Sequence, residues 1–541
     1  MVPKSVCLFL LLGWLAASVE AATECRKRFY GEDSFVCVCD VAGGCDQIDA
    51  IGDLSDDRVA VYSTSASADR LKRTVLFFDD TKLGRDVQAT VDTSVKKQTV
   101  LGIGGAITDS VVTIRNQLRR SELRDLLHAQ YYGPNGNSYT IARVPLGSSD
   151  FSLSQYSFDD TPDDFHIDHF VLDDMKADYL KQVVQDVPDI KLYASSWSAP
   201  AWMKDSGRMQ GPGQLKGFFN GIYYLAYARY LVKFFEEYYN QYAIRFWGMT
   251  VQNEPRTGAI PNWPIQTMYL SPEMQRDFVN LRLGPLLRDN WITKNITIMA
   301  NDDFRNVTMD AALKIYNVER DDTAVPGSFV DGLAVHWYEQ KTPFSVLTDV
   351  HNLRPDKFVL ATEACNSFLP FEQVPYYGRW KSGDLYAHDI LQNLRNWVVG
   401  WVSFANGSCG IVFFSTDWNI WLDTIGGPNW AGNFVDAAIL VNTTGDGEFY
   451  KQPMYYAIAH FSHFIPPGSK IVDFRIDQFD EDDVLEGVAA VTPDQRVVLV
   501  LLNRDPDQTF KLEIDDQKHA GTVLRVTMPP ASIKTLVWEL K

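Results

Sequence analysis

The chain has 541 residues, with 69 Asp and Glu against 50 Lys and Arg and a net charge of −19 at pH 7. A surface this acidic is repelled by polyphosphate, which argues against nucleic acid as a partner. Its 46% hydrophobic and 22% charged residues exclude a disordered chain and predict a folded protein with two or more domains.

Residues 1–21 are typical of a secretory signal peptide. Lys4 precedes an apolar stretch from Val6 to Ala17, and small residues lead to a predicted cleavage site after Ala21. The apolar stretch is shorter than the roughly 20 residues that cross a bilayer. No later run in the sequence is long and apolar enough to span a bilayer, so we expect a luminal or secreted protein.

The cysteines support an oxidising compartment. Four of the seven lie close together after the signal peptide: Cys25, Cys37, Cys39 and Cys45. In a secreted chain this cluster predicts two disulfides rather than a zinc site, because no His lies in the stretch. Three pairings are possible, and Cys25–Cys37 with Cys39–Cys45 closes the shortest loops. Four sequons are candidates for glycosylation: Asn295, Asn306, Asn406 and Asn442.

From residue 98 to 466 short β-rich runs alternate with longer helical patterns. The runs are 100–107, 139–145, 190–195, 244–252, 296–300, 332–337, 358–362 and 410–415, and an amphipathic helix is expected at 217–242. Parallel strands need crossover helices, so eight such units predict an α/β fold, a (β/α)8 TIM barrel. A doubly wound open sheet is the alternative, but the sequence has no glycine-rich dinucleotide fingerprint.

The two ends of the chain have a different pattern. Residues 22–97 and 467–541 consist of short alternating segments separated by Asp, Gly and Pro, which is typical of an antiparallel sandwich. Because both ends carry this pattern, we expect one all-β sandwich built from both. The disulfide-bonded start should belong to it, the barrel should be inserted between its halves, and a β excursion is expected near 420–449.

Two glutamates follow predicted barrel strands. Glu254 stands after the run 244–252 in Asn253-Glu254-Pro255, and Glu363 stands directly after the run 358–362. In such a barrel the carboxyl ends of the strands face the active site. Glycoside hydrolysis needs two opposed carboxyl groups, one to protonate the leaving oxygen and one to attack the anomeric carbon. The pair therefore predicts a glycosidase.

Several motifs together resemble the glucosylceramidases (acid β-glucosidases) of glycoside hydrolase family 30. They are Asn253-Glu254-Pro255, Thr362-Glu363-Ala364-Cys365, Ala334-Val335-His336-Trp337-Tyr338, Thr416-Asp417-Trp418-Asn419, Gly426-Gly427-Pro428-Asn429-Trp430 and Tyr450-Lys451-Gln452-Pro453-Met454. With the clustered cysteines, the resemblance covers nearly the whole mature chain. It implies a retaining mechanism with Glu254 as acid/base and Glu363 as nucleophile.

The resemblance also implies which residues bind glucose and which groups take part besides the protein. The sugar-binding residues would be Asp150, Trp197, Asn253, Tyr338, Trp418 and Asn433. Asn253 would hydrogen-bond the 2-hydroxyl and Tyr338 would lie beside the nucleophile, whereas His336 is expected to have a structural or supporting role. A place in the barrel core is the alternative for Trp197 and Trp418. Neither a metal nor another cofactor is implied.

The sequence departs from the family pattern at residues 402–415, which stand between Trp401 and Thr416 where relatives run almost directly on. Either the run 410–415 replaces the start of the eighth strand and the rest loops out, or the gene model includes sequence absent from the working protein. Ser149 also stands where the resembled enzyme has cysteine.

Three functions are compatible with these features. The first is hydrolysis of glucosylceramide in the lysosomal lumen, reached by the secretory pathway. The second is another sugar specificity on the same fold, and the third is an inactive sugar- or lipid-binding homologue. The substrate of the first function would be glucosylceramide. For that function the resemblance also implies a saposin-type activator, anionic phospholipid and peripheral contact with a membrane.

Overall fold

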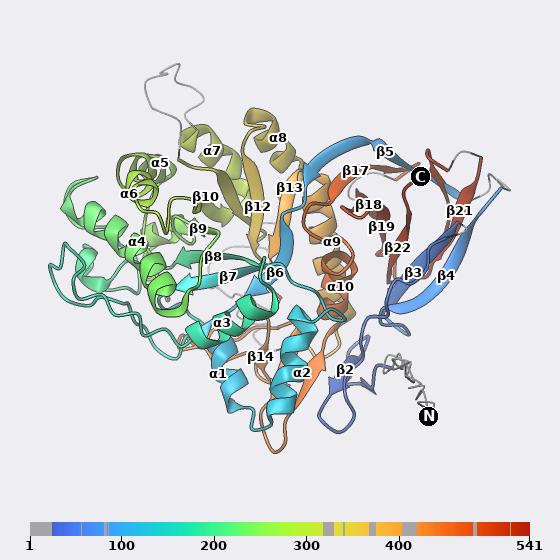
Figure 1. Cartoon of the computed structure of the whole chain (residues 1–541), viewed down its shortest axis with the longest axis horizontal. Coiled ribbons are helices and arrows are strands. Elements are labelled where there is room, and N and C mark those ends of the chain that lie inside the picture. The colour runs from blue at the N-terminus through green and yellow to red at the C-terminus, as the bar shows by residue number, and fades with distance from the viewer. Residues whose placement is uncertain are drawn as a thin grey trace, which may run out of the picture.

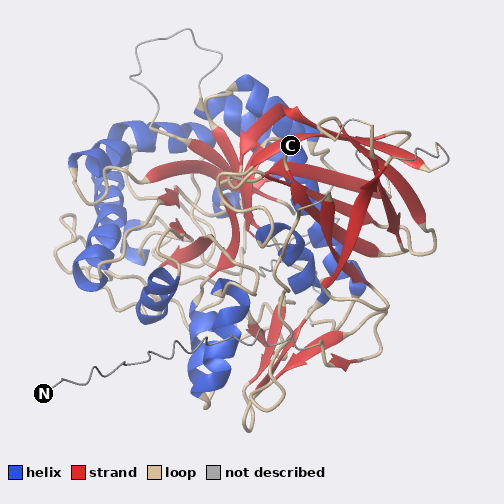
Figure 2. Ribbon diagram, turned by 45° about the vertical axis from the view of Figure 1, so that its right-hand side comes forward, coloured by secondary structure: helices blue, strands red, loops and turns tan. Residues whose placement is uncertain are grey.

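The computed structural model describes residues 24–55, 57–80, 84, 86–316, 329–338, 341–366, 375–402, 419–479, 484–519 and 521–541. The predicted signal peptide and Trp418 lie outside these residues. Figure 1 shows a barrel of strands surrounded by helices on the left and a β-rich domain on the right, and Figure 2 shows a smaller sheet below them.

Eight parallel strands close into a barrel. They are β6 (Gly102–Ala106), β7 (Ile141–Leu146), β8 (Lys191–Ser196), β9 (Gly248–Thr250), β10 (Thr297–Phe304), β11 (Gly332–His336), β12 (Phe358–Glu363) and β13 (Val398–Val402). Each strand pairs with the next along the chain, and β13 returns to pair with β6. The predicted (β/α)8 barrel is confirmed.

Helices connect and cover the barrel strands. They are α1 (Asp109–Gln117), α2 (Ser121–Tyr132), α3 (Ala177–Asp186), α4 (Ile222–Tyr242), α5 (Pro272–Phe278), α6 (Gly284–Asp289), α7 (Arg305–Ile315), α8 (Ser345–Leu353), α9 (Trp380–Arg395) and α10 (Pro453–Ser462), with short turns η1 (Ala201–Met203), η2 (Pro255–Ala259) and η3 (Val279–Leu283). Helix α4 begins later than predicted, because Gly217 and Asn220 have φ values of +76° and +58° that a helix does not accept.

The eighth barrel strand is β13, not the run 410–415 expected from the sequence. Trp397 has a φ of +68° and turns the chain out of α9, so that Val398 to Val402 pair at once with β12 and β6. Gly400 lies against the Gly102 carbonyl, where a Cβ would approach the oxygen to 2.4 Å. The run 410–415 belongs to residues 403–418, which lie outside the described residues.

Nine strands from both ends of the chain form the β-rich domain. They are β3 (Arg58–Ser65), β4 (Lys72–Asp79), β5 (Val87–Thr99), β17 (Lys470–Ile476), β18 (Leu485–Val491), β19 (Arg496–Asn503), β20 (Phe510–Asp516), β21 (Val523–Met528) and β22 (Ser532–Glu539). C-terminal β22 pairs with N-terminal β3, and β5 pairs with both β17 and β20, so the ladder closes into a ring. As predicted, one domain is built from both ends.

The disulfide-bonded start does not belong to that domain, which corrects the expectation from sequence. It joins a separate five-stranded sheet: β1 (Lys27–Arg28), β2 (Val36–Cys39), β16 (Glu448–Lys451), β15 (Ile439–Asn442) and β14 (Leu422–Asp423). The physical reason is strand pairing between segments that are distant in the sequence. Cys37 to Cys39 of β2 pair antiparallel with Phe449 to Lys451 of β16 and not with a strand of the β-rich domain. This sheet contains the β excursion expected near 420–449.

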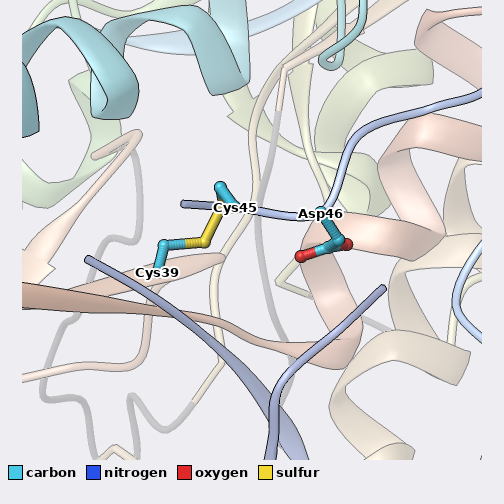
Figure 3. Close-up of side chains that lie close together, drawn as sticks. All are labelled: Cys39, Cys45 and Asp46. Carbon is cyan, nitrogen blue, oxygen red and sulfur yellow. A yellow bond between two sulfur atoms is a disulfide. The ribbon is translucent and has the colours of Figure 1, made fainter. Parts of the chain in front are cut away.

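The cysteines pair sequentially, as favoured from loop length. Cys25 is bonded to Cys37 and Cys39 to Cys45, with Cα–Cα distances of 5.1 and 4.6 Å. Figure 3 shows the second disulfide beside Asp46. Sulfur atoms joined to each other are not thiolate ligands, so Cys39, Cys45 and Asp46 do not make a metal site. The Asp46 carboxylate instead pairs with Lys451 Nζ at 3.0 Å.

Of the helices in the described part of the chain, none combines the length and the apolar character that crossing a membrane requires.

Candidate active site

A cluster of buried polar side chains gathers at the carboxyl ends of the barrel strands. Its members come from six consecutive strands or the residues just after them: Arg143, Ser195, Thr250, Asn253, Glu254, Asp302, His336, Thr362 and Glu363. Buried charged groups are stable only when they are paired and hydrogen-bonded, so the cluster must form one connected network.

Arg143 is the centre of that network. Its fully buried guanidinium donates to the Glu363 carboxylate, to Asp302 Oδ2 at 2.8 Å and to Asn253 Oδ1 at 2.9 Å. Its Nε donates to Ser195 Oγ at 3.1 Å. A planar fork with several donors can hold three partners in fixed positions, and its positive charge favours the ionised form of both carboxylates.

Asp302 and His336 form a second buried ion pair. His336 Nε2 lies 2.9 Å from Asp302 Oδ1, and Thr250 and Thr362 donate hydroxyl hydrogen bonds to the same carboxylate at 2.6 and 2.7 Å. Although burial opposes it, Arg143 and His336 hold the pKa of Asp302 below its usual range. Although burial opposes it too, Glu363 and Asp302 raise the pKa of His336 to about 10, so the ring is an imidazolium.

The two predicted catalytic glutamates meet at the other nitrogen of this ring. His336 Nδ1 lies 3.4 Å from Glu254 Oε1 and 3.3 Å from Glu363 Oε1. The nitrogen and one carboxylate oxygen from each glutamate all lie within 4.8 Å of one another. A proton on Nδ1 of the imidazolium faces both carboxylates, and the geometry fits a proton shared between them.

A strained backbone aims Glu254 at the cluster. Glu254 has φ +40° and ψ +57°, a left-handed conformation that is uncommon for residues other than glycine and costs about 1–3 kcal/mol. Its N–H donates to the Asp302 carbonyl at 2.9 Å, and the Thr257 hydroxyl donates to its carbonyl at 2.7 Å. These bonds turn the chain sharply from β9 into η2.

The environments of the two glutamates differ. Burial, assisted by the negative charge of Glu363 and opposed by His336, raises the pKa of Glu254 to about 7. Burial also raises the pKa of Glu363, but Arg143, His336 and the Tyr338 hydroxyl at 3.3 Å favour its ionised form. The described contacts of the Arg143 guanidinium include Glu363 and not Glu254, so Glu254 holds its proton more readily.

The predicted sugar-binding residues fall into two groups. Asp150 Oδ2 accepts hydrogen bonds from Asn433 Nδ2 at 3.1 Å and Asn429 Nδ2 at 3.3 Å, which brings together the loop after β7 and the segment between β14 and β15. Trp197, Asn253 and Tyr338 instead lie around the glutamates. The Arg143 guanidinium stands 5.0 Å from the centre of the Trp197 ring, and Trp197 is only 2% exposed.

Tyr338 lies beside the nucleophile, and burial and the charge of Glu363 raise the pKa of its hydroxyl well above the usual value. Trp418 lies outside the described residues. Of the sequons, Asn295 and Asn306 are exposed, Asn442 is partly exposed, and Asn406 lies outside the described residues.

Arg143 and Asp302 had no role in the sequence prediction, and His336 had only a supporting one. The signal for Arg143 was a charged side chain inside the apolar run 139–145, since such a residue needs a buried partner. Asp302 carried the same signal as Glu254, since it stands two residues after the predicted strand 296–300, but none of the quoted motifs contains it.

Comparisons with known proteins agree with this geometry. The glycosyl hydrolase family 30 TIM-barrel domain matches residues 100–465, and the family's beta sandwich domain matches residues 468–536. "Putative glucosylceramidase 3" of Caenorhabditis elegans is 38% identical over 99% of this chain and 98% of that protein. Lysosomal acid glucosylceramidase of Mus musculus is 35% identical over 98% of each.

Among solved structures, SrfJ from Salmonella typhimurium has the same fold, with a TM-score of 0.74 and 24% identity. The alignment covers 90% of this chain and all of that one. The two domain matches extend over most of the barrel and of the C-terminal strands, and the curated relatives align along almost the whole chain. The protein therefore belongs to glycosyl hydrolase family 30 and is a glycoside hydrolase.

Proposed function

We propose that the protein is a retaining β-glucosidase that hydrolyses glucosylceramide to glucose and ceramide in the lysosomal lumen. Glu254 is the acid/base and Glu363 the nucleophile. The substrate and the compartment rest on the similarity to the mouse lysosomal acid glucosylceramidase. The mechanism rests on the geometry of the two glutamates.

The single observation that supports retention is the short distance between the carboxyl groups, because one oxygen of Glu254 and one of Glu363 lie within 4.8 Å of each other. Retaining glycosidases hold their carboxyl groups about 5–5.5 Å apart, whereas inverting enzymes need about 6.5–9.5 Å to admit a water molecule. The separation therefore favours direct attack by one carboxylate on the sugar.

The charges around the glutamates support the division of roles. Arg143 donates to Glu363, which keeps this carboxylate available for attack on the anomeric carbon. Glu254, with a pKa of about 7, can deliver its proton to the leaving ceramide oxygen at acidic pH.

The charge of Glu363 also explains how Glu254 can act in the second step, the hydrolysis of the glycosyl-enzyme. When Glu363 becomes a glycosyl ester it loses its negative charge, and that charge is one of the causes that raise the pKa of Glu254. The pKa of Glu254 therefore falls in the intermediate, so the residue changes from acid to base and activates the water that releases glucose. Asp150, Asn433, Trp197, Asn253 and Trp418 are the proposed contacts to the glucose ring.

The test is glucose release from glucosylceramide in anionic vesicles near pH ~5, a pH at which Glu254 is protonated. Wild type should release glucose, and Glu363→Gln should lose this activity, whereas the exposed Glu539→Gln variant should keep it. The first sugar product, observed by NMR before mutarotation, should be the β-anomer. An α-anomer would exclude retention, and an inactive wild type would favour a binding homologue.

A further inference from the structure

Arg256 is a half-exposed cation that stands two residues after the proposed acid/base. It belongs to η2, which follows Glu254 directly at the carboxyl end of the barrel. Its Nε donates to Asp303 Oδ2 at 3.0 Å, and its Nη2 donates to Asp303 Oδ1 at 2.8 Å. This bidentate pairing fixes the plane and the direction of the guanidinium, because one whole edge of the group is used.

The end of β10 supplies the partner through an irregular backbone. Two consecutive aspartates hold two different arginines, since Asp302 pairs with the buried Arg143 and Asp303 pairs with Arg256. The pairing of β10 with β11 shifts register between Asn301 and Asp303, and Asn301 and Asp302 have φ values of +73° and +48°. Such irregularities redirect the side chains at a strand end. One arginine therefore contacts the nucleophile, and the other stands near the acid/base.

An aromatic wall connects Arg256 to the nucleophile. The guanidinium lies 5.5 Å from the centre of the Phe304 ring. Phe304 packs edge-on against the Tyr338 ring, with 4.9 Å between ring centres, and the Tyr338 hydroxyl donates to Glu363 Oε1 at 3.3 Å. A continuous run of contacts thus leads from the nucleophile to the half-exposed guanidinium.

Arg256 also interacts electrostatically with the acid/base. Although burial opposes it, Asp303 and the negative charge of Glu254 raise the pKa of Arg256. Burial is the largest cause that raises the pKa of Glu254, and the charge of Asp303 adds to it. Arg256, Asp303 and Glu254 are therefore neighbours at one side of the site.

One edge of the Arg256 guanidinium has no protein acceptor. The hydrogen bonds of Arg256 to the described residues use Nε and Nη2 and leave both hydrogens of Nη1 free. The side chain is 43% exposed, so a ligand can reach this edge. Nη1 is therefore a donor that is available to a substrate.

The leaving group of the reaction occupies the same side of the site. The acid/base protonates the glycosidic oxygen, so the aglycone extends from the sugar past Glu254. In glucosylceramide the aglycone carries an amide, whose carbonyl oxygen lies a few bonds from the glycosidic oxygen. Because Asp303 neutralises the charge of Arg256, the free edge suits a neutral acceptor such as this carbonyl better than an anion.

We propose that Arg256 determines the specificity for the aglycone by donating a hydrogen bond from Nη1 to the amide carbonyl of ceramide. The inference rests on the proposed function, because it assigns a contact to the leaving group of that reaction. Asp303 and Phe304 hold the guanidinium in position for this bond.

The test compares three β-glucosides that differ at the amide, all presented in the same detergent micelles. Short-chain glucosylceramide carries the carbonyl. Glucosylsphingosine has a free amine in place of the amide, and octyl β-glucoside has neither group. The measurement is kcat and KM for each substrate.

Arg256→Met removes the donor and keeps the length of the side chain. It should lower kcat/KM for glucosylceramide at least about tenfold relative to both other substrates, because only glucosylceramide loses a hydrogen bond from a charged donor. The loss should appear mainly as a raised KM, since the bond is remote from the reacting atoms. Arg208→Met, at an exposed arginine, is the matched control and should keep the selectivity of wild type.

The comparison of substrates on one variant separates this contact from an effect on the acid/base. Arg256→Met leaves Asp303 unpaired, and the resulting change at Glu254 acts on all three substrates. The double variant Arg256→Met with Asp303→Asn has no unpaired buried carboxylate, so it should fold if the single variant does not and should show the same loss of selectivity. Equal losses on the three substrates in the variants that fold would overturn the proposal, because Arg256 would then serve only Asp303.

The two proposals fail separately in these experiments. A wild type that cleaves octyl β-glucoside but neither sphingolipid contradicts the proposed substrate and, with it, the contact. A wild type that cleaves glucosylceramide with a selectivity that Arg256→Met does not change contradicts only the role of Arg256.

Discussion

At the scale of single residues, the site depends on how Arg143 and His336 distribute charge between two buried glutamates. Arg143 bonds Glu363, and His336 Nδ1 lies between Glu363 and Glu254. Carboxyl groups this close do not ionise together easily. Glu363, which accepts the hydrogen bond from the Arg143 guanidinium, is therefore the one that becomes the anion. The two proposed roles thus follow from one asymmetric contact.

Arg143→Lys tests this asymmetry. A lysine keeps the charge but not the planar fork, so the bonds to Asp302, Asn253 and Glu363 cannot all remain. A lost charge-assisted hydrogen bond is worth about 1.5–3 kcal/mol, which predicts a fall in kcat/KM of roughly tenfold to a hundredfold. The acidic limb of the pH profile should also move to higher pH, because Glu363 ionises less readily.

The measurement is kcat/KM against pH for a soluble β-glucoside, with thermal unfolding as the check on folding. Arg208→Lys, on an exposed side chain, is the matched control. A variant with reduced activity but an unmoved acidic limb would mean that Arg143 serves packing and not the ionisation of Glu363.

Glu254 sets the alkaline limb. Its folded-state pKa of about 7 is raised above the ordinary value of 4.5, so the protonated acid is present below pH 7 and is lost as the pH rises through it. The kcat/KM of wild type should therefore fall about tenfold per pH unit above ~7. Glu254→Ala should abolish this limb for a substrate with a good leaving group.

Glu254→Ala also tests the second step of the reaction, the hydrolysis of the glycosyl-enzyme. Without a base, Glu254→Ala should accumulate the glycosyl-enzyme, and azide should restore turnover by attacking it and releasing the β-glucosyl azide. An α-azide from Glu254→Ala, or no response to azide in any variant at position 254, would contradict the acid/base assignment.

At the scale of elements, α10 is joined to the β-rich domain through one buried histidine. His460 on α10 lies 2.8 Å from Thr535 Oγ1 on β22 and 2.7 Å from Thr64 Oγ1 on β3. Burial lowers the pKa of His460 to about 3, so the ring is neutral in the folded protein. A lowered histidine pKa means that the unfolded chain binds the proton more tightly, and stability is lost as the pH falls below about 6.5.

His460→Gln should remove this pH dependence. From pH ~7 to ~5, proton binding to this histidine in the unfolded chain lowers the free energy of unfolding by about 2 kcal/mol. The glutamine variant binds no such proton, so its free energy of unfolding should not show this decrease. Urea unfolding at both pH values measures the difference, with exposed His166→Gln as control. If the two variants share the same pH dependence, His460 is not the titrating group.

At the scale of the whole molecule, the two ends of the chain complete each other. Strand β3 pairs with β22 and β5 with β17 and β20, so the N-terminal strands have no complete sheet without the C-terminal ones. Unpaired strand edges with apolar faces promote aggregation. The barrel and the β-rich domain should therefore not be separable by simple truncation.

Removal of residues 467–541 should give an insoluble chain, because β3 and β5 then expose their edges. Co-expression of 1–466 with 467–541 as two chains should restore soluble, active protein, since the same ladders can form between them. Soluble yield and size-exclusion chromatography give the readout. A soluble and active 1–466 fragment alone would show that the barrel does not depend on the shared sheet.

Local patterns were enough to predict the barrel and Glu254 with Glu363. Alternation of strands and helices is a short-range property, and a strand end marks the active-site face wherever the strand is found. The eighth strand was misplaced because both 398–402 and 410–415 are β-rich runs in the sequence. The pairing that selects Val398 to Val402 involves Val359, Ala361 and Gly102, which lie elsewhere in the chain.

The sequence by itself determined the fold class and the two proposed catalytic glutamates, and it favoured one of three possible disulfide pairings. Only the tertiary structure decided the network of Arg143, Asp302 and His336 and the place of the N-terminal strands in a separate sheet. The physical reason is the same in each case. Charge pairing, strand pairing and exposure depend on neighbours that are distant in the chain, and these become neighbours only when the barrel closes.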